Sequence, residues 1–423
     1  MKLLWLTNSP ANYCLKFSSD GYNGVGWVSS AENYISNIQD IDLAIGFVMS
    51  EQSFKVKQNN TTYYPIPNPV HKTSIERFQK LMRFALNYGI KTYENKIEQY
   101  YKDYFRIIIN DFKPDIIHVW GSEQYMGLVS EVTEIPVVLH IQGIINPCLN
   151  AFLPPGFSWE QWIGMKKSLC SILLRKMEKN LWKNNADREK RILKRVKYLM
   201  GRTEWDKRVS EIYAPNAIYM HSGELLREVF YKKTERIIPQ IKTIVSIISN
   251  TPYKGYDMIL KTASVLKNDL NVDFEWRCYG NIDPYFIEKR IGINHVDVNV
   301  RLMGVASAEL LYDSLKQSTI YFHPSYIDNS PNSVCEAQLL GIPVVATNVG
   351  GISSIVNDGI NGYLVPANDP FQAAYCINEL FFNEEINKAF GDKGQKIATM
   401  RHNRQTIVNE LLGNYDKILK SNK

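Results

Sequence analysis

The stretch from His323 to Gly351 reads His-Pro-Ser-Tyr-Ile-Asp-Asn-Ser-Pro-Asn-Ser-Val-Cys-Glu-Ala-Gln-Leu-Leu-Gly-Ile-Pro-Val-Val-Ala-Thr-Asn-Val-Gly-Gly. A strand ends at its first residue, and a loop of turn-forming residues follows. A helix is then predicted from about Ser333 to Leu340, where Gly341 supplies a left-handed stop. The next strand is Val344–Thr347. The stretch therefore predicts a strand–helix–strand unit of a parallel sheet, in which the helix begins beyond the carboxyl end of a strand.

The same alternation of short apolar strands and longer helical patterns runs along the whole chain, which is typical of parallel sheets covered by helices. There are too many strands for one sheet of ordinary size. A length of 423 residues fits two doubly wound domains better. The expected strands are Leu3–Leu6, Leu43–Val48, Ile116–Trp120, Val137–Ile141, Tyr198–Met200, Ile241–Ile248, Phe274–Tyr279, Ile320–His323, Val344–Thr347 and Tyr363–Val365.

The two expected domains meet at a polar, proline-containing stretch, Tyr231–Gln240, that precedes a new apolar strand. The N-terminal domain is then residues 1–235, and the C-terminal domain is residues 236–402. The last segment, residues 403–423, carries apolar residues at helical spacing. We expect this helix to pack back on the N-terminal domain.

The bulk composition is that of an ordinary globular chain, with 45% hydrophobic residues, 22% charged residues and a net charge of +6. This charge gives no sign of nucleic-acid binding. The six cysteines have neither metal-ligand nor redox spacing, which favours a reducing compartment. The apolar run Leu3–Leu6 is too short for a signal peptide, and no stretch approaches the roughly 18 to 20 apolar residues of a membrane span. A cytoplasmic location is therefore expected.

One segment, residues 166–197, is unusually basic, because its basic residues outnumber its acidic ones twelve to three. Apolar residues, among them Trp182, are interleaved with the charges. A basic helix with an apolar face is typical of an element that lies on a membrane surface. A solvated helix of an ordinary domain has the same composition, so the sequence leaves both interpretations open.

The predicted helix after Pro331 begins where ligands bind in open α/β sheets. Unpaired backbone N–H groups and the helix dipole make such a helix start an anion site. Asp328 lies in the loop before the helix, and Glu336 is expected in the first turn. Two carboxylates beside a phosphate site suit the recognition of hydroxyl groups. Taken singly, Glu336 could be a helix-capping residue and Asp328 a turn residue.

At these residues the chain resembles the retaining glycosyltransferases of the GT-B fold, family 4. That family carries an acidic residue, seven further residues and then a glutamate, which is the spacing of Asp328 and Glu336. The resemblance implies two Rossmann-like domains that face across a cleft, an N-terminal acceptor side and a C-terminal donor side. Several short motifs resemble those of the bacterial surface-polysaccharide members of this family: Asp-Asn-Ser-Pro-Asn-Ser, Gly-Ile-Pro-Val-Val-Ala-Thr and, downstream, Asn-Asp-Gly-Ile-Asn-Gly-Tyr-Leu-Val-Pro.

The resemblance assigns roles on the donor side. Glu336 would hold the ribose hydroxyls, and Asp328 would hold hydroxyls of the donor sugar. Lys254, in Tyr-Lys-Gly-Tyr-Asp, matches the family lysine that neutralises the diphosphate, although its position also suits a surface lysine. The remaining residues of the expected donor site supply backbone contacts to sugar and phosphate or border the base: Gly24, Gly26, Gly280, Val305, Asn329, Ser330, Pro331, Ser333 and Val334.

The expected acceptor side lies on the N-terminal domain. Gly24 and Gly26 belong to a glycine-rich loop between the first strand and a helix, where the backbone can approach a phosphate. Two further strands resemble the family strands that face the cleft. This resemblance implies a catalytic role for His140 and acceptor-side roles for His118 and Gln142. Each histidine has an alternative interpretation as an ordinary core residue.

The chain departs from the family pattern at Ser249, where members usually carry a phosphate-binding arginine; Arg202 or Arg277 could replace it. The resemblance implies retention at the anomeric carbon, no metal and no cofactor, since the nucleotide sugar is a co-substrate. The expected setting is capsule, O-antigen or exopolysaccharide synthesis with a sugar or lipid-linked acceptor. Two alternatives stay open, a non-catalytic sugar-nucleotide-binding subunit and a sugar-nucleotide epimerase. The sequence specifies neither the sugar nor the nucleotide.

Overall fold

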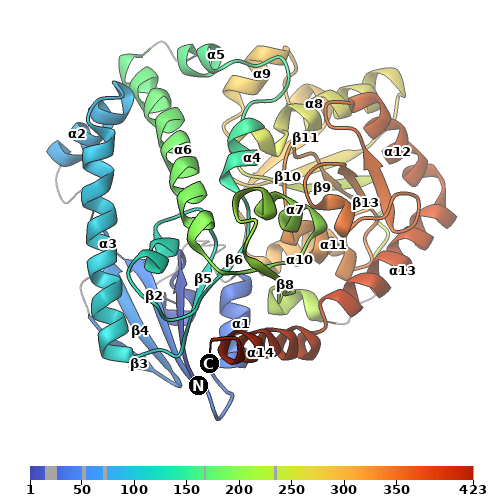
Figure 1. Cartoon of the computed structure of the whole chain (residues 1–423). Helices are drawn as coiled ribbons and strands as arrows, with labels where there is room; N and C mark the ends of the chain where they lie inside the picture. Colours follow the sequence, from blue (N-terminus) through green and yellow to red (C-terminus); the bar gives the residue numbers. More distant parts are fainter. Residues whose placement is uncertain (15–25, 50–53, 70–73, 166–167, 233–235, 423) are drawn as a thin grey trace.

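The computed structural model describes residues 1–14, 26–49, 54–69, 74–165, 168–232 and 236–422. These residues form two α/β units, each built on its own sheet (Figure 1). The strands of the first sheet are β1 (Lys2–Thr7), β2 (Asp42–Met49), β3 (Val56–Gln58), β4 (Thr61–Pro67), β5 (Ile116–Trp120), β6 (Val137–His140), β7 (Tyr198–Gly201) and β8 (Ile218–His221). Those of the second are β9 (Thr243–Ile247), β10 (Glu275–Tyr279), β11 (Val300–Gly304), β12 (Ile320–His323), β13 (Val344–Thr347) and β14 (Gly362–Val365).

The first sheet has the order β3-β4-β2-β1-β5-β6-β7-β8, and the second has the order β11-β10-β9-β12-β13-β14. All pairings are parallel except that of β3 with β4. Both orders reverse direction beside the first strand of their unit, which is the doubly wound arrangement. The predicted fold class of two Rossmann-like domains is therefore confirmed.

Helices cover the sheets, as parallel pairing requires. The α-helices in the described residues are α1 (Trp27–Ile35), α2 (Ser74–Ala85), α3 (Ile90–Phe112), α4 (Ile145–Asn150), α5 (Trp159–Gly164), α6 (Leu169–Arg195), α7 (Glu204–Tyr213), α8 (Tyr256–Ser264), α9 (Tyr285–Ile291), α10 (Ala308–Lys316), α11 (Asn332–Leu339), α12 (Pro370–Phe382), α13 (Glu384–Arg401) and α14 (Arg404–Lys420). Within these residues, none is long and apolar enough to cross a bilayer.

All ten predicted strands are present, and β3, β4, β8 and β11 were not predicted. β4 contains Pro65 and Pro67, which argue against a strand because proline cannot donate to the ladder. In this sheet β4 lies next to the edge, where only β3 follows it. β3 pairs with only the first three residues of β4, so among the described residues the outer side of β4 has no strand partner at the two prolines, while Tyr63, Tyr64 and Ile66 are buried.

The chain crosses between the units at two places, and a third segment contacts the other unit without crossing. Leu226, Val229 and Phe230 follow β8 but already pack into the core of the second unit. The segment of α4 and α5 also contacts that unit, since the rings of Trp162 and Phe286 lie 4.7 Å apart in an edge-to-face contact. Finally, α14 leaves the second unit and runs back under the first (Figure 1).

The apolar face of α14 completes the core of the N-terminal unit, where Ile407, Leu411 and Tyr415 pack with β1. Tyr415 also makes polar contacts in this core. Its hydroxyl accepts a hydrogen bond from the indole N–H of Trp5 at 3.2 Å and lies 2.6 Å from Nδ1 of His118. Because all three side chains are buried, water cannot replace a lost partner.

We expect Tyr415→Phe to lower the free energy of unfolding by about 1–3 kcal/mol, because it leaves two buried polar groups without a partner. Urea unfolding followed by tryptophan fluorescence measures the change. The matched control is Tyr375→Phe on α12, where the ring is 65% exposed and little effect is expected. Equal stability of Tyr415→Phe and wild type would contradict a stabilising role for this hydroxyl.

Candidate functional site

Lys254 and Asp328, two of the predicted site residues, meet at the carboxyl ends of β9 and β12. Lys254 ends the short 3₁₀-helix Pro252–Lys254, and its Nζ lies 2.6 Å from Oδ2 of Asp328. Gly255 allows this approach, because it has a φ of +79° and a Cβ there would collide with the carbonyl oxygen of Pro324. Nε2 of His323 lies 3.1 Å from the same Asp328 oxygen. The structure thus gathers one carboxylate, one lysine and one imidazole.

Asp328 is held as a charged group. Burial acts to raise the pKa of its carboxyl, but Lys254 and His323 outweigh burial and hold the pKa well below its usual range. Gly350 and Gly351 fix the backbone of this loop, because the N–H of Gly351 donates a hydrogen bond to the carbonyl of Asp328 at 3.0 Å. Gly350 has a φ of +53°, and a Cβ there would collide with that carbonyl. The Gly-Gly pair therefore positions the carboxylate.

Glu336 is the fifth residue of α11, so the expectation that it lies in the first turn is wrong. Its side chain is fully buried, and both oxygens are paired with Arg227: Nε to Oε1 at 2.7 Å and Nη2 to Oε2 at 2.6 Å. Burial raises the pKa of Glu336, and Arg227 opposes that rise. A ribose at this carboxylate would have to share it with Arg227 or displace that side chain.

A second buried carboxylate, Glu224, covers the start of α11. It accepts a hydrogen bond from Ser330 Oγ at 3.1 Å, and Arg202 Nη2 lies 3.1 Å from its other oxygen. With the Asn332 amide oriented so that its nitrogen faces Glu224, that nitrogen lies 3.1 and 3.0 Å from the two carboxylate oxygens. Burial raises the pKa of Glu224, although Arg202 acts to lower it. Arg202, proposed from the sequence as a replacement phosphate ligand, is thus engaged by Glu224.

Asn329 joins the two units. Its side-chain nitrogen donates to the backbone carbonyl of Gln142 at 3.1 Å and to Asp206 Oδ2 at 2.9 Å. Its side-chain oxygen accepts a hydrogen bond from Thr203 Oγ1 at 2.5 Å. The predicted sugar-binding loop and the predicted acceptor-side residue Gln142 are therefore in contact, and the interface at this point is closed.

The other predicted donor residues are divided between the two ends of the cleft. Val334 N–H donates to the carbonyl of Pro331 at 3.0 Å, so this amide is engaged within its own helix start. Gly280 and Val305 follow β10 and β11 at the carboxyl edge of the second sheet, where they would border a base. The remaining members are Ser333, which is partly exposed, Gly26, which precedes α1, and Gly24, which lies outside the described residues.

The structure brings His118 and His140 together but places them in a core rather than at an open cleft. Their exposed fractions are 0% and 1%, and Nδ1 of His140 lies 3.2 Å from Nε2 of His118. Burial lowers the pKa of His118 to about 3 and that of His140 well below its ordinary value, so both rings are neutral. Trp27 and Trp120 pack against His140. The catalytic role of His140 and the acceptor-side role of His118 stay predictions, and the burial of both rings does not favour them.

Ser249 is uncharged and Arg277 is already paired, so neither residue supplies a free cation for a phosphate. Ser249 Oγ donates to Thr251 Oγ1 at 3.3 Å, and Arg277 pairs with Glu275 at 2.9 Å. The residues that sequence reasoning missed are Arg227 and Glu224, because the segment after β8 has neither a motif nor a periodic pattern. Only their position just before the expected domain boundary could have drawn attention to them.

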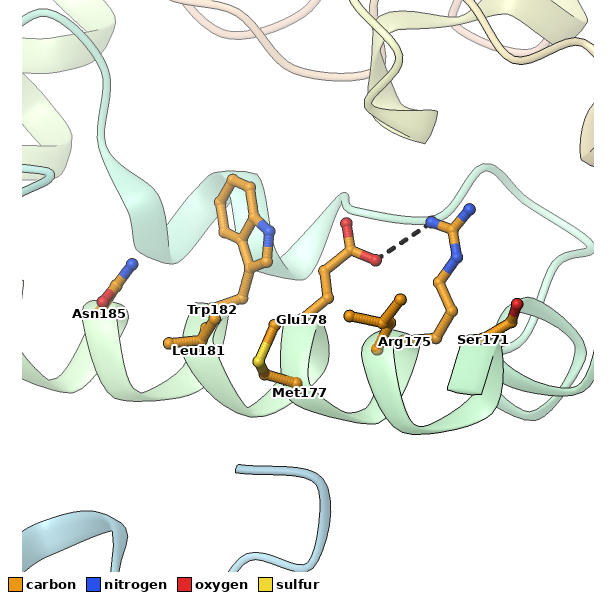
Figure 2. A pocket seen from close by; sticks show the side chains of 8 residues that line it. Ser171, Arg175, Met177, Glu178, Leu181, Trp182 and Asn185 are labelled. Carbon is orange, nitrogen blue, oxygen red and sulfur yellow. Dashed lines mark hydrogen bonds and ion pairs between the residues drawn. The ribbon is translucent and has the colours of Figure 1, made fainter. Parts of the chain in front are cut away.

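Most of the basic segment, Leu169–Arg195, forms α6, and residues 166–167 lie outside the described residues. Figure 2 shows that Arg175, Glu178 and Trp182 project to one side of this helix, where they line a cavity of about 640 Å³. The Trp182 ring lies 6.2 Å from that of Tyr253 in the second unit. The tryptophan that suggested a membrane surface therefore faces the interior of the protein.

Comparison with known proteins places this geometry in context. Residues 230–397 match the family model for glycosyl transferases group 1. A capsular polysaccharide biosynthesis glycosyltransferase, CapM of Staphylococcus aureus, is 23% identical over 224 residues, covering 53% of this chain and 52% of CapM. A D-inositol 3-phosphate glycosyltransferase of Paenarthrobacter aurescens is 28% identical over 153 residues, covering 34% of this chain and 36% of that protein. The chain thus spans about half or less of the length of these relatives.

Solved structures resemble the whole chain. Sucrose-phosphate synthase of Thermosynechococcus elongatus aligns with a TM-score of 0.72 at 12% identity, covering 100% of both chains. The Anabaena protein HepE, in complex with UDP and glucose, aligns with a TM-score of 0.62 at 14% identity, covering 98% of this chain and 99% of HepE. At these identities the likeness shows the fold alone, and that fold is the predicted GT-B arrangement.

We expect Arg227→Met to lower the free energy of unfolding by about 3–5 kcal/mol, because it leaves the buried Glu336 carboxylate without its cation. The double variant Arg227→Met/Glu336→Gln should recover most of this loss. The control is Arg208→Met, whose pair with Glu204 is exposed and should contribute less than about 1 kcal/mol. Denaturant unfolding measures all three, and a double variant no more stable than Arg227→Met would contradict the pairing.

Proposed function

We propose that the protein is a retaining glycosyltransferase of family 4, which moves a sugar from a nucleotide-diphosphate sugar to an acceptor. The observation that carries this proposal is the contact of Lys254 with Asp328 beside the start of α11. Both residues lie within the segment that matches the group 1 model. A lysine beside a helix start suits a diphosphate, and a carboxylate next to it suits a sugar hydroxyl.

In the proposed reaction, donor binding changes the partners of Lys254 and Asp328. Lys254 and Asp328 neutralise each other in this structure. We propose that the diphosphate takes Lys254 while the hydroxyls of the donor sugar take Asp328, so that neither charge is left unpaired. Asn329 and Ser330 must also exchange their contacts with the N-terminal unit, which requires the two units to separate and then close over the donor. The ribose would bind at Glu336 once Arg227 shares or leaves that carboxylate.

The proposed reaction retains the configuration at the anomeric carbon. The bond between that carbon and the diphosphate oxygen breaks, and its electron pair goes to the diphosphate, where Lys254 stabilises the developing charge. The acceptor hydroxyl attacks from the same face, and its proton goes to the leaving phosphate. We propose that no metal takes part, because Lys254 supplies the positive charge, and we expect transfer to continue in the presence of EDTA.

The acceptor class is proposed from the capsular relative. CapM is named for capsular polysaccharide biosynthesis. We propose a related role in capsule, O-antigen or exopolysaccharide synthesis, with a sugar or lipid-linked oligosaccharide as acceptor. Such an acceptor would place the protein at the inner face of a membrane.

The proposed donor site predicts that Lys254→Met weakens UDP binding. The loss of a hydrogen bond to a charged group corresponds to about 10- to 100-fold in affinity. Calorimetric titration with UDP, followed by assays with UDP-sugars on monosaccharide and lipid-linked acceptors, provides the measurement. The matched control is Lys261→Met, because Lys261 has a similar exposed fraction and pairs with the buried Asp257 at 2.8 Å on α8. Equal weakening by both variants would refute the role of Lys254, and failure of the wild type to bind any of UDP, GDP, ADP and dTDP would refute the proposed function.

The proposed membrane contact depends on the first half of α6. Leu169 and Leu174 are 73% and 45% exposed there, and Lys176 and Lys183 are exposed beside them. Each basic residue near an anionic surface contributes about 1 kcal/mol. We expect Lys176→Glu/Lys183→Glu to reduce co-sedimentation with phosphatidylglycerol vesicles at least about tenfold, whereas Lys393→Glu on α13 should change it little. Equal binding to neutral phosphatidylcholine vesicles would contradict an electrostatic contact.

A further inference from the structure

Glu123 is a carboxylate of the cleft that neither the sequence motif nor the matched family segment includes. It lies in the loop after β5, and its Oε1 accepts a hydrogen bond at 3.1 Å from the N–H of Gly143, in the loop after β6. The carboxyl ends of neighbouring parallel strands form the ligand-binding edge of an open α/β sheet. The residue before Gly143 is Gln142, whose carbonyl accepts the hydrogen bond from Asn329. Glu123 therefore stands beside the contact that joins the N-terminal unit to the proposed sugar-binding loop.

A neighbouring glutamate, Glu189, has a structural role in the same part of the first unit. Its Oε1 accepts hydrogen bonds from Ser122 Oγ at 2.6 Å and from the N–H of Ile145 at 3.0 Å. Its Oε2 accepts from the N–H and the side chain of Asn146 at 3.1 and 2.8 Å. Glu189 thus orders the start of α4 with both oxygens, and this part of the fold does not need a second carboxylate for that purpose.

Glu123, in contrast, uses only part of its capacity to accept hydrogen bonds. Its Oε2 is buried and has no hydrogen-bond partner among the described residues. Buried polar atoms in folded proteins are nearly always paired, and an unpaired one calls for a ligand or another explanation. Oε2 lies against Gly121 of the same loop, where an added Cβ would meet it at 2.2 Å, while the residue as a whole is partly exposed, so an incoming group can approach it from that exposed side.

The surroundings of Glu123 set its charge near neutral pH. Burial raises the pKa of its carboxyl to about 7, and the charge of Glu189 adds to this rise, whereas Arg202 acts in the opposite direction. The charge of Glu123 also contributes to the raised pKa values of Cys148, on α4 of the same unit, and of Tyr253, in the second unit. Glu123 is therefore charged above pH 7 and becomes neutral as the pH falls below that value.

We propose that Glu123 binds the acceptor, with Oε2 accepting a hydrogen bond from a hydroxyl of a neutral sugar. The inference deepens the proposed function and rests on it. A carboxylate accepts hydrogen bonds from hydroxyl groups about twice as strongly as a neutral group does. It repels a phosphate or a carboxylate, so the part of the acceptor that enters at this point is an uncharged, hydroxyl-bearing ring. The diphosphate stays on the opposite side of the cleft, with Lys254.

The test uses the full chain saturated with UDP and titrated with D-glucose, D-galactose and N-acetyl-D-glucosamine. Saturation-transfer NMR measures sugar binding at pH 8 and pH 6. For at least one sugar, the wild type should bind about tenfold more weakly at pH 6, where Glu123 is protonated. Glu123→Gln keeps an acceptor for the Gly143 N–H, so it should bind UDP like wild type. It should bind sugar about tenfold more weakly at pH 8 and show no pH dependence.

The matched control is Glu134→Gln, an exposed glutamate that precedes β6 at the opposite edge of the same sheet. It should behave like the wild type at both pH values. UDP binding without binding of any of the three sugars would refute the inference and leave the proposed function intact. The same holds for a Glu123→Gln variant that binds sugar like the wild type. Failure of the wild type to bind UDP or any of the other three nucleoside diphosphates would refute both.

Discussion

Three carboxylates are buried around the start of α11, and each has a cation supplied by a different part of the chain. Arg227, from the segment after β8, pairs with Glu336; Arg202, from the loop after β7, pairs with Glu224; and Lys254, from the loop after β9, pairs with Asp328. A buried charge without a partner costs several kcal/mol. The paths of these three segments are therefore constrained together, and the relation of the two units depends on that constraint.

The same balance governs what the site can bind. Three negative and three positive side chains leave the start of α11 without net charge, so a diphosphate cannot simply fill an empty positive pocket. It has to take a cation from a carboxylate, and that carboxylate needs a new donor. A sugar supplies such donors through its hydroxyls, which is why Lys254 and Asp328 are suited to receive the two parts of one molecule. Inorganic phosphate would take Lys254 from Asp328 and offer no hydroxyl in exchange, which would leave that carboxylate with His323 as its remaining side-chain partner. Recognition at this site thus favours a ligand that is anionic at one end and rich in hydroxyls at the other.

Sequence reasoning succeeded where a local pattern carries the information. Buried parallel strands appear as short apolar runs, and the spacing of Asp328 and Glu336 marked the helix that follows Asp328 and contains Glu336. It failed where the information is not local. β4 was missed because its prolines are tolerated only at that place in the sheet order. Arg227 and Glu224 lie in a segment without periodicity. His118 lies in the middle of β5 and His140 at the end of β6, and the partner that keeps His118 in the core is Tyr415 of α14, nearly 300 residues further along.

The return of α14 bears on how the cleft can open. Two segments cross between the units near one another, the one after β8 and the junction of α13 with α14. They are tied together, since Nδ1 of His402 lies 3.0 Å from the carbonyl of Glu224, and Tyr231 Oη donates to the carbonyl of His402 at 3.1 Å. An ion pair between Arg404 and Glu228 adds to this tie. Because both crossings are bonded to each other, they must bend together. The proposed opening for donor binding would then turn the units about this junction and break the contacts of Asn329, while α14 keeps its contacts with the first sheet through Tyr415.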